Sequence, residues 1–99
     1  MREFAEYDRT FDAVLTDAMA AVGKGEIKLV QQIMAPYASI AFFQAKIKEC
    51  VRQAAFNRLS NLLSENSMAM ARTIAAYYLK EFGKDDEYEK LLRQYGLMR

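Results

Sequence analysis

The chain has 99 residues, of which 53% are hydrophobic and 27% are charged, a composition that excludes an intrinsically disordered protein. Its net charge of +1 gives no overall preference for nucleic acid or for an anionic membrane surface. One proline and four glycines stand among many good helix formers, so the sequence predicts a single all-α domain over residues 1–99.

The first predicted helix covers residues 3–22. Apolar residues recur there at spacings of three and four, the pattern of an amphipathic helix: Phe4, Tyr7, Phe11, Val14, Ala18 and Ala21. Two arginines oppose five acidic residues in residues 1–22, a net charge of −3. Gly23 and Gly25 then predict the end of the helix and a turn.

The second predicted segment runs from residue 26 to 63 as a long central helix, kinked or broken near Pro36. Proline removes one backbone hydrogen bond and clashes with the preceding turn, here at the carbonyl of Gln32. A straight helix of this length would span about 57 Å. A compact chain of this size has a radius of gyration of only about 13 Å. The segment is therefore expected either to break or to belong to an elongated, paired bundle.

Two shorter helices are expected at the C-terminal end. Residues 67–82 form the third helix, which Gly83 ends, and residues 86–95 form a short fourth one with an aspartate cap. The predicted fold is thus a compact or elongated bundle of three main helices plus a short C-terminal helix.

Residues 29–45 carry no charge, although lysines flank them on both sides. Seventeen residues that include three glutamines are a poor membrane span, so no membrane contact is expected. A segment apolar on all sides is expected in the core, with part of it in a homodimer interface. The residues predicted for that interface are Met34, Ala38, Phe42, Phe43 and Ala45.

The residue types leave little material for catalysis. There is no histidine, one cysteine and no nucleotide-binding glycine motif, so no catalytic residue, cofactor site or metal site is predicted and the protein is expected not to be an enzyme. The acids at helical spacing in the first segment leave a Mg²⁺-dependent hydrolase as a remote alternative, although a solvated acidic face explains them better: Glu3, Glu6, Asp8 and Asp12.

Two binding hypotheses remain beside self-association. A basic face of the central helix would suit a small nucleic-acid-associated subunit, and its residues are Lys46, Lys48, Arg52 and Arg58. An adaptable groove could open near Met68 and Met70, because methionine side chains repack around different partners.

The leading interpretation is a non-enzymatic protein–protein interaction module that forms a homodimer. The single cysteine, Cys50, and the charged start without a signal-peptide pattern predict a cytoplasmic location.

Overall fold

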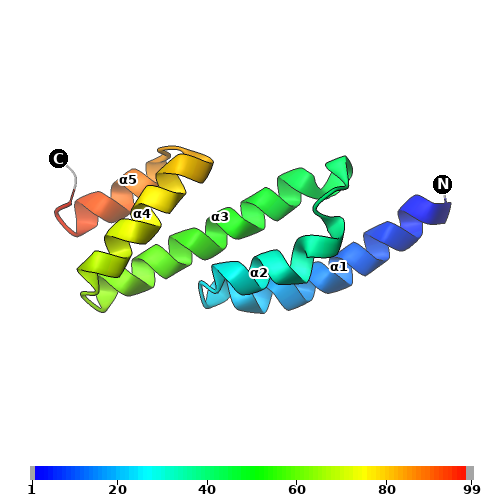
Figure 1. The fold of residues 1–99 in the computed structure, drawn as a ribbon, viewed down its shortest axis with the longest axis horizontal. Coiled ribbons are helices and arrows are strands. Elements are labelled where there is room, and N and C mark those ends of the chain that lie inside the picture. Colours follow the sequence, from blue (N-terminus) through cyan, green and yellow to red (C-terminus); the bar gives the residue numbers. More distant parts are fainter. Residues whose placement is uncertain (1, 98–99) are drawn as a thin grey trace.

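The computed structural model describes the backbone of residues 2–97 and the side chains of residues 11–97, and it confirms the all-α prediction. Within that range there are five α-helices and one 3-10 helix, where the sequence predicted three main helices and a short one (Figure 1). In chain order they are α1 (Arg2–Gly23), α2 (Ile27–Met34), the 3-10 helix η1 (Ala35–Tyr37), α3 (Ala41–Ser64), α4 (Met68–Phe82) and α5 (Asp86–Gln94).

Residues 26–63 form a helical hairpin that is interrupted near Pro36, so the chain breaks there and does not continue as one kinked helix. The first helix of the hairpin, α2, ends at Met34, and Pro36 lies in η1. The backbone is extended at Ile40 before α3 begins at Ala41. The two helices run in opposite directions along each other (Figure 1). Proline prevents the helix from continuing, and the residues between the helices let the chain turn back.

The long helix α3 is shared between two hydrophobic cores. Its N-terminal half packs against α1 and α2, and its C-terminal half packs against α4 and α5 (Figure 1). Cys50, Val51 and Ala54 belong to the first core, whereas Ala55 and Leu59 belong to the second. Because the two cores follow each other along one helix, the molecule measures 51 Å by 21 Å by 17 Å.

Aromatic packing fixes the first core near the start of α3. The ring of Phe43 stacks on that of Phe11 with centroids 4.3 Å apart, and Tyr37 packs edge-on against both rings. All three side chains are buried. Helix α1 is thereby attached to η1 and to α3 at once.

The C-terminal helices begin and end close to the predicted residues. The cap of α5 is Asp85, whose Oδ1 accepts a hydrogen bond of 2.8 Å from the backbone N–H of Tyr88. Gly83 follows α4 with a φ of 81°, a conformation that glycine adopts without strain. The limits of both helices thus lie within one residue of the predicted ones, although only α5 has a side-chain cap at its start.

Candidate functional site: a groove between α2 and α4

A groove with a volume of about 790 Å³ lies between α2 and α4 and also includes Arg58 of α3. The buried residues of the two flanking helices belong to different cores, and the groove lies between these helices. Val30 of α2 packs in the first core, and Ala71 of α4 packs in the second. The groove is lined by Gly25, Glu26, Ile27, Lys28, Leu29, Gln31, Gln32, Arg58, Met70, Thr73, Ile74 and Tyr77.

One hydrogen bond joins the two walls directly. Gln31 Nε2 donates to the hydroxyl of Tyr77 over 3.4 Å. Burial raises the pKa of Tyr77, and the nearby carboxylate of Glu81 raises it further. The Tyr77 hydroxyl is therefore neutral at physiological pH, and it acts in the groove as a polar group without charge.

Large apolar side chains on both walls remain exposed. Leu29 on α2 is 39% exposed and Met70 on α4 is 53% exposed, while Ile27 and Ile74 are half-buried between them and the cores. The expectation of a methionine-lined groove is met in part, because Met70 lines the groove but Met68 packs against the second core. Exposed apolar side chains that line one concavity are typical of a surface that binds another molecule.

Charged groups of both signs line the same groove without ion-pair partners among the described side chains. Within residues 11–97, ion pairs form only at Arg52, Lys84 and Arg93. The half-buried Arg58 therefore has no carboxylate partner there, and Glu26 makes no side-chain cap bond at the start of α2. Both groups remain available to a bound molecule.

A close backbone contact holds the α1–α2 turn, and hence one end of the groove, against α3. Gly25 has a φ of 69°, and a Cβ built on it would lie 2.7 Å from the backbone N and Cα of Arg58. One residue earlier on α3, Asn57 Nδ2 donates a 2.8 Å hydrogen bond to the carbonyl of Val22 at the end of α1. The turn is thus fixed against the helix that carries Arg58.

The four residues predicted as a basic face lie in different surroundings along α3. On an α-helix with 3.6 residues per turn, Lys46 and Arg58 point well away from the direction shared by Lys48 and Arg52. Arg58 lines the groove, and Lys46 is exposed with its Nζ 6.0 Å from the centroid of the Phe11 ring. Lys48 is also exposed. Sequence spacing suggested a common face, but the helical geometry separates these charges.

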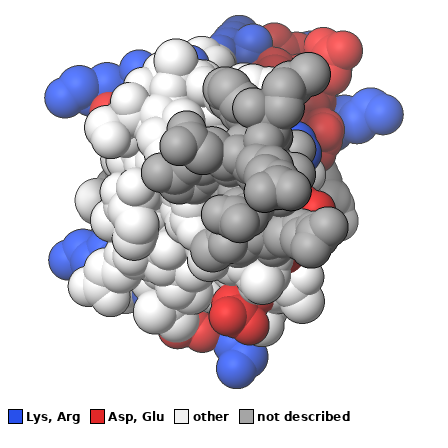
Figure 2. All heavy atoms as spheres, turned by 90° about the vertical axis from the view of Figure 1, so that its right-hand side faces the viewer, with Lys and Arg blue, Asp and Glu red and all other residues white. Residues whose placement is uncertain are grey.

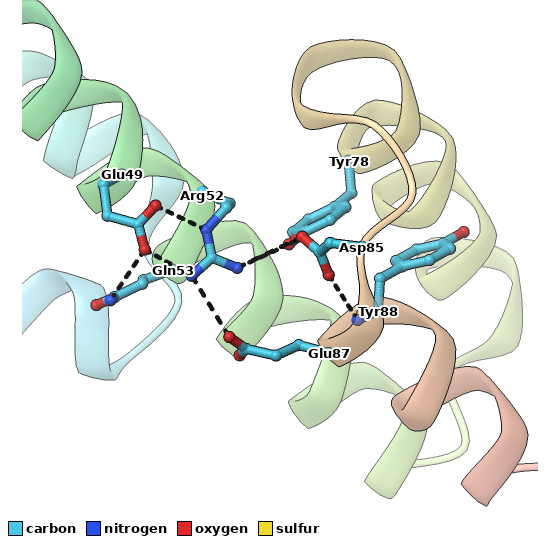
Figure 3. Close-up of polar contacts among 7 residues, drawn as sticks. All are labelled: Glu49, Arg52, Gln53, Tyr78, Asp85, Glu87 and Tyr88. Carbon is cyan, nitrogen blue, oxygen red and sulfur yellow. Dashed lines mark hydrogen bonds and ion pairs between the residues drawn. The ribbon is translucent and has the colours of Figure 1, made fainter.

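Arg52 is occupied within the chain by a polar cluster that links α3 to the start of α5 (Figure 3). Its Nε and Nη2 donate to the two carboxylate oxygens of Glu49 over 2.9 and 2.6 Å, and its Nη1 donates to the Tyr78 hydroxyl over 2.8 Å. That hydroxyl donates in turn to Asp85 Oδ2. Glu87 lies 3.8 Å from Nη2. These acids compensate the Arg52 charge, so the residue is a poor phosphate ligand.

The pKa values in this cluster change accordingly. Burial, together with the hydrogen bond to Asp85, raises the pKa of the Tyr78 phenol to about 12. The hydrogen bond from Arg52 lowers the pKa of Glu49, and the same pair raises the pKa of Arg52. Tyr78 is fully buried and stacks on Tyr88 with centroids 5.2 Å apart, which indicates that the cluster stabilises the second core.

The five residues predicted for an interface are divided by the fold. Met34 and Phe43 are buried in the first core of their own chain, so their side chains do not lie on the surface predicted for an interface. Ala38, Phe42 and Ala45 are exposed, and Phe42 is 63% exposed. Figure 2 shows the end of the molecule that lies on the right in Figure 1. Among the described residues visible there, uncharged ones cover much of the surface, and the charged side chains lie around them.

The described part of the chain shows no arrangement of side chains that could bind a metal ion. No group of three or more Asp, Glu or Cys side chains there is placed to hold a metal ion. Asp12 is exposed, while the side chains of Glu3, Glu6 and Asp8, like those of Phe4 and Tyr7, lie outside the described residues. Cys50 is a buried thiol whose pKa is raised by burial.

The chain matches no protein family model, no curated protein and no solved structure. Between residues 2 and 97, none of the helices is both long enough and apolar enough to cross a membrane. The groove is therefore interpreted from its own chemistry.

Sequence reasoning anticipated some of the groove residues and missed others. Met70 was predicted to lie at an adaptable groove. Arg58 was predicted to belong to a basic face of the central helix and not to this groove. Nothing in the sequence distinguished Glu26 or Tyr77. Both became candidates only when the fold placed them in the same groove.

Proposed function

We propose that this protein is a non-enzymatic helical interaction module that associates with a second copy of itself through the groove between α2 and α4. The observation that carries this proposal is the pair of exposed apolar side chains, Leu29 and Met70, on opposite walls of one groove. Burying them against another chain would gain roughly 25 cal/mol for each Å² of apolar surface removed from water.

Several features support a second protein chain as the occupant rather than a small substrate. Most of the surface that lines the groove is apolar, and the methionine can adapt to a partner's surface. The sequence contains no histidine, the side chain most often used as a general acid or base near neutral pH. A single cysteine suits a reducing compartment, so we expect this association in the cytoplasm.

The test compares two substitutions on α4. Light scattering at micromolar concentration should give about twice the 11.4 kDa chain mass for the unmodified protein. Met70→Glu places a charge in the groove and should give the monomer mass. Leu79→Glu is the matched control, because Leu79 is 43% exposed on the same helix but does not line the groove.

Circular dichroism of each variant should retain the helical signal, which separates dissociation from unfolding. A protein that is monomeric at every concentration would refute the proposal. It would also be refuted if Met70→Glu and Leu79→Glu had equal effects on the mass.

A further inference from the structure

We infer that two copies meet at this groove around a two-fold axis, with Glu26 of each copy paired to Arg58 of the other. The inference rests on the proposed function and adds the geometry of the complex and the residues that select the partner. In such an interface each surface meets an identical one, so the surface must be complementary to itself.

The charges of the groove meet this requirement. Glu26 and Arg58 line the same groove with opposite signs, and neither is paired within the described side chains of its own chain. A two-fold axis converts one such pair into two ion pairs across the interface. Lys28 is exposed and lines the same groove. If Glu26 of one copy did not pair with Arg58 of the other, the half-buried guanidinium of Arg58 would have no opposite charge beside it in the interface, and this is costly.

The shape of the groove allows the same arrangement. The exposed side of α2 carries Lys28, Leu29 and Gln32, and this helix forms one wall of the groove. In a two-fold complex, α2 of each copy can lie over the groove of the other. Leu29 would then reach the exposed Met70 of the partner copy, which places apolar contacts at the centre and charges around them. This is the usual layout of a protein interface.

The experiment reverses one charge at a time and then mixes the variants. Glu26→Lys makes the groove wholly basic, and Arg58→Glu adds an acid to it. Each variant alone should dimerise on the order of 10- to 100-fold more weakly, because like charges then face each other. In a 1:1 mixture, the lysine introduced at position 26 of one variant faces the glutamate introduced at position 58 of the other. The second pair, Arg58 with Glu26, is native, so the mixture should recover the dimer mass in light scattering.

Lys24→Glu provides the matched control, since Lys24 is exposed in the same turn but does not line the groove. It changes the charge as much as Arg58→Glu and should leave dimerisation within about twofold. Circular dichroism of each variant establishes that it is folded before mixing. If Arg58→Glu does not fold, Arg58→Gln replaces it in the mixture. Its Glu26 then faces the native Arg58 of the Glu26→Lys copy, so the mixture should still form more dimer than Glu26→Lys alone.

The possible failures separate the inference from the proposed function. If Met70→Glu gives monomers but the two charge variants remain dimers, or do not recover the dimer on mixing, the groove is the interface and the two-fold exchange is wrong. If Met70→Glu has no effect on a dimer, the groove is not the interface and both statements fail.

Discussion

Replacing Gly25 with alanine tests whether the α1–α2 turn is packed against α3 as tightly as the structure indicates. Gly25 has a φ of 69°, and its built Cβ lies 2.7 Å from two backbone atoms of Arg58. Gly96 at the end of α5 provides a matched control. Its φ is 72°, nothing lies within 4 Å of its built Cβ, and the same hydrogen-bond pattern encloses both turns.

The losses of stability caused by the two substitutions should therefore differ only by the steric overlap at position 25. A left-handed conformation costs a non-glycine residue about 1–2 kcal/mol, and this cost applies to both positions. Overpacking adds typically about 1–3 kcal/mol, and it applies only at Gly25, where the obstacle is backbone that cannot rotate away. We expect a loss of about 2–5 kcal/mol for Gly25→Ala and about 1–2 kcal/mol for Gly96→Ala.

Urea unfolding followed by circular dichroism at one fixed protein concentration measures both losses. With a dependence of about 1–3 kcal/mol per molar urea, the two midpoints should be clearly separated. Equal losses for the two variants would refute the reasoning, because the turn would then be free to move away from α3. The groove would in that case lack the rigid end that Gly25 gives it.

Two further predictions concern the cores. Phe43→Ala should cost about 3–5 kcal/mol in the free energy of unfolding, because a buried ring stacked on Phe11 is lost. Phe42→Ala, at a site 63% exposed, should cost less than about 1 kcal/mol, and equal losses for the adjacent residues would contradict the assigned packing. The free energy of unfolding, measured at increasing pH, should fall between pH 10 and about 12. In that range the unfolded chain ionises Tyr78 while the folded chain keeps it neutral. Burial also raises the pKa values of Tyr77 and Tyr88, so Tyr78→Phe should reduce this dependence without abolishing it, and an unchanged dependence would contradict the raised pKa.

The helices themselves were largely determined by the sequence. Apolar spacing, glycines and an aspartate cap predicted the all-α class and the approximate limits of α1, α4 and α5. These signals are local, because a helix is held by bonds between residues four positions apart and ends where such bonds cannot continue. Pro36 likewise marked a break in the chain. The direction that the chain takes afterwards depends on packing, which no local signal reports.

The packing of the aromatic residues decided which of two adjacent phenylalanines is buried. Phe42 and Phe43 were both predicted for the interface, but only Phe43 is buried. The position of Phe11 on α1 and of Tyr37 on η1 selects Phe43 for the core. The same reasoning explains why the predicted interface was divided between the core and the surface.

The groove also belongs to the tertiary structure. Its walls come from residues 25–32 and 70–77, segments about forty positions apart that meet only because each helix packs beside the other on α3. Glu26 and Arg58 likewise line the same groove only because of the tertiary structure. Sequence periodicity reports which side of a helix is apolar, but the angle at which helices cross depends on how their side chains interlock, and this decides what lies between them.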